Sequence, residues 1–259
     1  MGKKQNNITS KIACGYALGF AIFCLIAALI SLLLILPMMN FSLPLPNANA
    51  SANTTFTIVI DAGHGGEDGG CEGNGLVEKN LNLDIALALA DMLEKEGVSV
   101  VLTRETDILL YDPNSNYEGK KKAQDVRARL EIAKNCENPV LVSIHMNYFA
   151  QTQYSGLQVW YSKNDSSSKA LANLIQSKVK ATLQQSNKRT IKEATSSIFL
   201  LHNATFPAVL IECGFLSNTD DARALSNADY RHQLTKTIFS AIMDYISQNN
   251  TWFFRWIYL

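Results

Sequence analysis

The chain has 259 residues, with 23 basic and 23 acidic side chains, so its formal net charge is zero. This balance excludes a strongly basic nucleic-acid-binding protein and a disordered chain kept extended by charge repulsion. Hydrophobic residues make up 47% of the chain, which is ordinary for a globular protein, but they are distributed unevenly along it.

The first part of the chain has the pattern of a membrane segment. Residues 12–39 are almost entirely apolar and carry no charge, which is longer than the roughly 20 residues that cross a bilayer as a helix. We expect an uncleaved transmembrane anchor here rather than a cleaved signal peptide, although Ala48-Asn49-Ala50 has the pattern of a cleavage site. The lysines before it predict that residues 1–11 are cytoplasmic and that the main domain lies outside.

The remaining boundaries follow from composition. Residues 40–55 are rich in Pro, Asn, Ser and Ala and are interpreted as a linker, which leaves a domain at 56–248. The tail at 249–259 is strongly aromatic. We expect it to cover a groove of its own domain, with contact to the membrane surface or to a partner as the alternatives.

Within the domain, short apolar runs alternate with segments of helical periodicity. This alternation predicts an α/β sheet with helices on both faces. The predicted strands are 55–60, 98–102, 140–144, 157–161, 197–201 and 208–211, and the predicted helices are 81–95, 123–134, 168–183 and 231–247.

Polar residues stand where several predicted strands end. His64 follows the first strand, His145 the third and Glu212 the last, and Glu78 opens the first helix. Ligands of parallel α/β sheets bind beyond the carboxyl ends of the strands, so these side chains can converge. Two imidazoles and one carboxylate form a three-ligand zinc site, and zinc lowers the pKa of a bound water towards neutrality. A second carboxylate, Glu212, then suits general acid–base work.

Each of these residues also has an ordinary structural interpretation. Taken alone, a strand-end histidine such as His64 is more often a hydrogen-bonding loop residue than a metal ligand. Taken alone, Glu78 is consistent with a favourable acid at a helix N-terminus, and Glu212 with a partner of an arginine. The glycines around His64 lack the Lys-Ser/Thr of a phosphate-binding loop, and no C-x-x-C pair supports a cysteine zinc site. Spacing alone leaves these alternatives open.

Five ordered blocks of the domain resemble the zinc-dependent N-acetylmuramoyl-L-alanine amidases of the amidase-3 family. The matching blocks are 59–66, 78–83, 103–104, 143–147 and 207–218. The resemblance implies a twisted, mostly parallel sheet of about six strands. It also implies that His64, Glu78 and His145 bind Zn²⁺, that Glu212 is the catalytic base and acid, and that the substrate is the amide between the lactyl group of N-acetylmuramic acid and L-alanine of the peptidoglycan stem.

Finer features resemble the spore-cortex amidases of endospore-forming bacteria. These features are the N-terminal anchor, the lack of cell-wall-binding repeats, and the segment 120–127. The resemblance implies removal of stem peptides as the first step of muramic-δ-lactam formation, at the forespore or cortex side of the membrane. An activating or metal-stabilising protein partner is a further expectation.

Two other functions and two residues stay open. The chain also fits a zinc peptidase acting within the stem peptide, or a non-catalytic, membrane-tethered wall-binding protein. His202 is a candidate donor to the oxyanion or an ordinary loop histidine, and Cys213 is a small hydrophobe or a reactive thiol.

Overall fold

The computed structural model describes residues 56–111, 114 and 120–249. Its elements are β1 (Thr57–Ala62), β2 (Glu72–Gly73), β3 (Leu76–Val77), α2 (Glu78–Lys95), β4 (Ser99–Leu102), α3 (Lys121–Lys134), β5 (Pro139–Asn147), β6 (Gln158–Tyr161), α4 (Ser166–Thr182), β7 (Lys192–Glu193), α5 (Phe199–Asn203), β8 (Ala208–Phe215), α6 (Thr219–Ser226) and α7 (Ala228–Asn249). The predicted anchor at 12–39, the linker at 40–55 and tail residues 250–259 lie outside the described part, so these boundaries stay predictions. None of the described helices has the length and apolar character that crossing a membrane requires.

A six-stranded sheet in the order β4-β1-β5-β8-β6-β7 forms the centre of the domain. Neighbouring strands are parallel except β6 and β8, which are antiparallel. The prediction of a mostly parallel sheet of about six strands is therefore confirmed. All six residues of β1 are buried, as expected for a central parallel strand that is covered on both faces.

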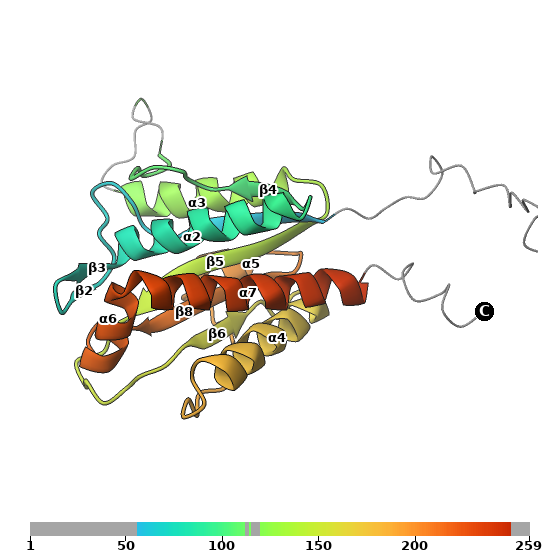
Figure 1. The fold of residues 1–259 in the computed structure, drawn as a ribbon. Helices are drawn as coiled ribbons and strands as arrows, with labels where there is room; N and C mark the ends of the chain where they lie inside the picture. Colours follow the sequence, from blue (N-terminus) through green and yellow to red (C-terminus); the bar gives the residue numbers. More distant parts are fainter. Residues whose placement is uncertain (1–55, 112–113, 115–119, 250–259) are drawn as a thin grey trace, which may run out of the picture. The chain divides into compact units, whose positions relative to one another are not determined.

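Helices cover both faces of the sheet, as the alternation of strands and helices predicted. Helices α2, α7 and α4 lie side by side over one face, where they enclose the larger apolar core (Figure 1). Helix α2 contributes Leu81, Ile85, Leu89 and Leu93, whose four-residue spacing places them on one buried side of the helix. Helices α3 and α5 enclose a smaller core on the opposite face.

The predicted strand at 197–201 is wrong, because this segment enters helix α5. A strand would send the adjacent Leu200 and Leu201 to opposite faces, whereas the helical turn lets both join the smaller core. The sheet edge is taken instead by β7, which pairs with β6 and which the sequence did not predict. A short apolar run does not by itself distinguish a strand from a buried helical turn.

A cluster of charged side chains is buried between the sheet and α3. The guanidinium of Arg129 donates to Asp61 Oδ1 at 2.7 Å and to Asp125 Oδ2 at 2.7 Å. Hydroxyls of Thr103 and Ser143 complete the hydrogen bonds of Asp61. All five side chains are buried, and this set is called the Asp61 cluster below. Burial raises the pKa of Asp61, but the charges of Arg129 and His145 and the hydrogen bonds from Ser143 and Arg129 together hold the pKa below its usual value.

The Asp61 cluster is expected to support the fold strongly, because removal of one partner leaves a buried charge uncompensated. Asp61→Asn should lower the free energy of unfolding by about 3 kcal/mol. The matched control is Asp91→Asn, which breaks an exposed pair with Lys95 and should cost less than about 1 kcal/mol. Denaturant unfolding at neutral pH measures both values.

The same variant tests the charge of Asp61. Since folding lowers the pKa of Asp61, its contribution is present at neutral pH and is lost as the pH falls through the folded-state value. The stabilities of the wild type and Asp61→Asn should therefore converge below about pH 4. A stability difference that stays constant down to pH 2 would show that Asp61 acts by shape alone.

Candidate active site

The register of the sheet places two of the predicted residues side by side. His145 on β5 pairs with Glu212 on β8, and Glu212 pairs in turn with Gln158 on β6. Paired residues of adjacent strands point to the same face, so these three side chains form a row across the sheet. The β5–β8 register shifts just after His145, and such irregularities of pairing commonly re-aim side chains near functional sites.

His64, Glu78 and His145 come together as the sequence predicted. Their ligand atoms all lie within 4.8 Å of one another. Glu78 Oε1 lies 3.0 Å from His145 Nδ1 and 3.3 Å from His64 Nε2. Two imidazole nitrogens and one carboxylate oxygen match a catalytic zinc site, which keeps one coordination position open. The donor set therefore fits zinc, and the ligand role of each residue stays a prediction.

The backbone fixes Glu78 at the start of α2. Its Oε1 accepts the N–H of Met146 at 3.0 Å, and its Oε2 accepts the N–H of Cys71 at 2.7 Å. Burial raises the pKa of Glu78, but the hydrogen bonds and charges of His145 and His64 together lower it far below its usual value. Glu78 is thus held as a carboxylate in one orientation.

His64 is held in an unusual backbone conformation. Its φ is 61°, in the left-handed region that non-glycine residues seldom occupy. Arg129 Nη2 donates to its carbonyl at 2.8 Å, which ties this turn to the Asp61 cluster. Arg104 holds the preceding carbonyls of Ala62 and Gly63 at 2.8 and 3.1 Å. Two buried arginines therefore stabilise the loop that carries the first predicted ligand.

An acidic residue orients the imidazole of His64. Asp68 Oδ2 lies 2.8 Å from His64 Nδ1, and Lys122 donates to Asp68 Oδ1 at 2.6 Å. Burial lowers the pKa of His64, but Glu78 and Asp68 outweigh it and raise the pKa to about 9. The site therefore attracts positive charge. The side chain of Lys122 is itself mostly exposed to solvent.

Two glycines leave room for the predicted ligands. A Cβ on Gly63 would lie 2.2 Å from His145 Cε1, and a Cβ on Gly70 would lie 2.5 Å from Glu78 Oε2. Gly70 also has a φ of 72°, which side-chain-bearing residues seldom adopt. The glycines around His64 and Glu78 thus serve close packing rather than phosphate binding.

Glu212 lies next to this group in a contrasting environment. Its Oε2 is buried and has no hydrogen-bond partner among the described residues. Burial and, after it, the charge of Glu78 raise the pKa of Glu212, and they outweigh the opposing charges of His64 and Arg189, so that the pKa is about 8. A carboxyl group with a pKa near neutrality can both accept and release a proton, which fits the predicted acid–base role.

Two residues left open by the sequence lie away from this centre. His202 is exposed on α5 and is not among the residues that line the cavity at His64 and His145. Cys213 is buried in the larger core, on the face of the sheet opposite to Glu212. The structure therefore gives no support to His202 as an oxyanion donor or to Cys213 as a reactive thiol.

Sequence reasoning assigned no role to Asp68, Arg104, Arg129 or Arg189. Arg104 lies in the matching block 103–104, which indicated the family but no role for this residue. Asp68 and Arg129 had a weaker signal, since they stand four residues after His64 and Asp125. That four-residue spacing is common for surface pairs and does not indicate a buried network. Arg189 had no signal, because only tertiary packing brings it near Glu212.

Comparison with known proteins identifies the family. The N-acetylmuramoyl-L-alanine amidase model (Amidase_3) matches residues 58–244, which include all four predicted site residues. The chain belongs to this amidase family. The amidase is 32% identical over 191 residues to the germination-specific N-acetylmuramoyl-L-alanine amidase of Bacillus subtilis, a match that covers 74% of this chain and 80% of that protein. It is accordingly a peptidoglycan amidase.

Solved structures agree with this assignment. The CwlD amidase from Clostridioides difficile, solved in complex with the GerS lipoprotein, superposes with a TM-score of 0.70 at 38% identity. That match covers 74% of this chain and 99% of the solved one. The amidase AmiC2 of Nostoc punctiforme gives a TM-score of 0.63 at 30% identity, over 74% and 98% of the two chains.

This geometry predicts that zinc affinity depends on the three ligands and on the residues that orient them. Glu78→Gln should weaken zinc affinity more than 100-fold, because it removes a charged ligand, and Asp68→Asn should weaken it about 10- to 100-fold. Competition with a chromophoric chelator measures the affinity. Glu72→Gln, on the exposed β2, is the matched control and should bind like the wild type. Wild-type affinity in Glu78→Gln would contradict the assigned site.

Proposed function

We propose that this amidase is zinc-dependent and cleaves the bond between the lactyl carbonyl of N-acetylmuramic acid and the nitrogen of L-alanine. The observation that carries the proposal is that a three-donor group lies next to Glu212, whose buried Oε2 has no hydrogen-bond partner among the described residues. Membership of the amidase family supports the choice of bond.

The residues divide the work of hydrolysis. His64, Glu78 and His145 would hold the zinc ion, which would supply Lewis acidity and lower the pKa of a water molecule at the site. Glu212 accepts a proton from the attacking water as the new carbon–oxygen bond forms. It then delivers that proton to the alanine nitrogen as the carbon–nitrogen bond breaks. Its raised pKa suits both transfers at neutral pH.

Two other functions are less well supported. A zinc peptidase acting within the stem would use the same donors, but the family match favours the muramoyl amide. A non-catalytic wall-binding protein has no need of Glu212, whose burial without a hydrogen-bond partner is energetically costly. The retention of this residue beside the three donors favours catalysis.

The biological setting that we propose is the spore cortex. Removal of stem peptides there would be the first step of muramic-δ-lactam formation. Similarity to a germination-specific amidase and to CwlD supports this setting. The apolar segment at 12–39 supports a membrane anchor with the amidase domain outside the cytoplasm. We also propose an activating or metal-stabilising protein partner, since the similar CwlD was solved in complex with a lipoprotein.

Replacement of Glu212 separates catalysis from metal binding. Glu212→Gln should retain zinc but lose at least 100-fold in the release of stem peptides from purified peptidoglycan, because the amide cannot accept the proton. Mass spectrometry of the products measures the release and shows which bond is cut, and metal analysis measures the zinc content.

Glu131→Gln on the exposed surface of α3 is the matched control and should keep full activity. Wild-type turnover in Glu212→Gln would disprove its role. Products cut within the stem would instead identify the protein as a peptidase.

A further inference from the structure

The row of side chains across the sheet continues beyond the catalytic carboxyl group. After His145 and Glu212 comes Gln158 on β6. Gln158 Oε1 accepts a hydrogen bond from Arg189 Nη2, and Gln158 Nε2 donates to the carbonyl of Thr190 at 2.8 Å. Gln158 therefore holds the segment that follows α4 against the sheet, with Arg189 directed to the Glu212 side.

Arg189 is a cation with no anionic partner among the described residues. Its guanidinium lies over the ring of Phe215, 4.7 Å from the centroid. Its Nε is buried and has no hydrogen-bond acceptor in the described part of the chain. The charges of Glu212 and Asp221 act on it without forming an ion pair. The nearby Asp221 instead accepts hydrogen bonds from the N–H groups of Gly156 and Phe215.

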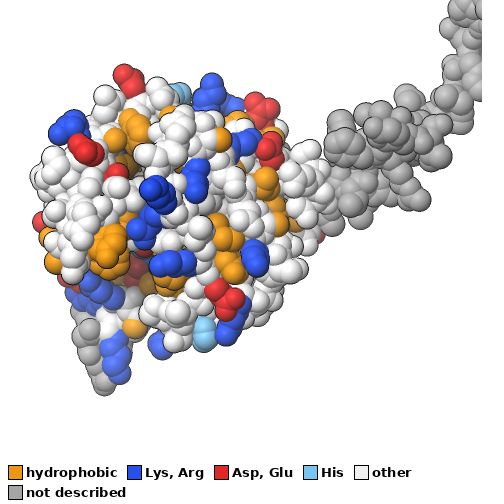
Figure 2. Space-filling model, turned by 90° about the horizontal axis from the view of Figure 1, so that it is seen from below, with side chains coloured by type: hydrophobic (Ala, Val, Ile, Leu, Met, Phe, Trp, Pro, Cys, Tyr) orange, Lys and Arg blue, Asp and Glu red, His pale blue; other side chains and the backbone are white. Residues whose placement is uncertain are grey.

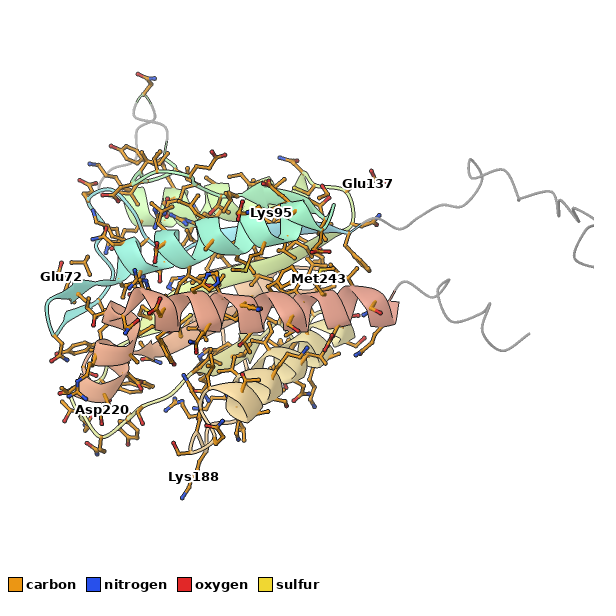
Figure 3. The ribbon with its side chains drawn as sticks, viewed as in Figure 1. Glu72, Lys95, Glu137, Lys188, Asp220 and Met243 are labelled. Carbon is orange, nitrogen blue, oxygen red and sulfur yellow. The ribbon has the colours of Figure 1, made fainter. Side chains whose placement is uncertain are left out.

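Arg189 stands between two open cavities of about 560 and 510 Å³. Tyr154, Lys188 and Arg189 line both cavities, and Phe149 lines the second. Lysine and arginine side chains gather on the face of the molecule near α4, where acidic side chains are few (Figure 2). Lys188 projects into solvent from the segment after α4 (Figure 3). Gln158, the strand neighbour of Glu212, also lines the second cavity, so a groove with basic and aromatic walls begins one strand away from Glu212.

A planar guanidinium with unused N–H groups is suited to a carboxylate, which it can bind through two parallel hydrogen bonds. The leaving group of the proposed reaction is a peptide that begins with alanine and carries carboxylates further along. Paired residues on adjacent strands have Cβ atoms about 5 Å apart, so Gln158 lies at about that distance from Glu212. Because Arg189 is hydrogen-bonded to Gln158, it lies within reach of the first one or two peptide residues after the alanine whose bond is cut.

We propose that Arg189 binds the carboxylate of the stem residue next to alanine and makes the amidase selective for acidic stems over amidated ones. The inference rests on the proposed amidase function and adds a specificity determinant to it. Phe215, which packs against one face of the guanidinium, and Gln158, which is hydrogen-bonded to it, fix the orientation of the Arg189 side chain. Tyr154 and Phe149 form the apolar wall of the groove that receives the peptide.

A competing role for Arg189 is electrostatic support of Glu212. In that case its loss would affect every substrate equally and would shift the pH profile of kcat. Carboxylate binding predicts instead an effect that depends on the substrate and appears mainly in KM.

The experiment uses two synthetic muramoyl peptides that differ only in a carboxylate or a carboxamide on the residue after alanine. The zinc-loaded full-length wild type should cleave the acid form with a kcat/KM about 10-fold or more above that of the amide form. Arg189→Gln should lose this preference by slowing on the acid form alone. Arg189→Lys should keep part of it, and Lys95→Gln, which removes an exposed charge on α2, should keep all of it.

A binding measurement keeps the test independent of turnover. Calorimetry with the free acid and amide stem peptides, which are products and are not cleaved, should show the same preference in the wild type and its loss in Arg189→Gln. Equal cleavage and equal binding of both peptides by the wild type would overturn the inference and leave the amidase function intact. An equal loss on both substrates in Arg189→Gln would assign Arg189 to Glu212 instead. Cleavage of neither substrate would contradict the proposed function itself.

Discussion

The buried guanidinium of Arg129 is the interaction on which the site depends. It neutralises Asp61 and Asp125 in the interior, and it also donates to the backbone carbonyls of Ala62 and His64. A single side chain on α3 thus joins the end of β1 to the loop that carries the first predicted ligand. The strained left-handed backbone of His64 persists because these contacts determine its position.

Two carboxyl groups lie close together and have opposite environments. The carboxylate oxygens of Glu78 accept hydrogen bonds from backbone N–H groups and lie against two imidazoles, and the pKa of Glu78 is far below the usual value. Glu212 lacks a partner for Oε2, and its pKa is about 8. Such a division supports the proposal that one carboxylate holds a cation and the other moves a proton. The difference arises from which backbone groups each side chain reaches, because both residues are glutamate.

The sheet arranges these functions in space. Its parallel strands bring His145 and Glu212 to the same edge, and the antiparallel β6 adds Gln158 and, through it, Arg189. The proposed metal binding, the proposed proton transfer and the proposed recognition of the leaving peptide follow one another along adjacent strands. Helices α3 and α5 cover the same face further from that edge and close the smaller core beneath it.

The sequence by itself determined the α/β class and most strands and helices, because buried strands are continuous apolar runs. It also predicted the four residues of the centre. The strand-end positions of His64, His145 and Glu212 indicated that these side chains can converge, but their roles and that of Glu78 were predicted only from the resemblance to the amidase family. Only the tertiary structure decided that 197–201 is helical, since packing selects the conformation of a short apolar segment. It alone showed Arg129 buried and Arg189 beside Glu212, because such contacts join residues far apart in the chain, and local periodicity carries no information about them.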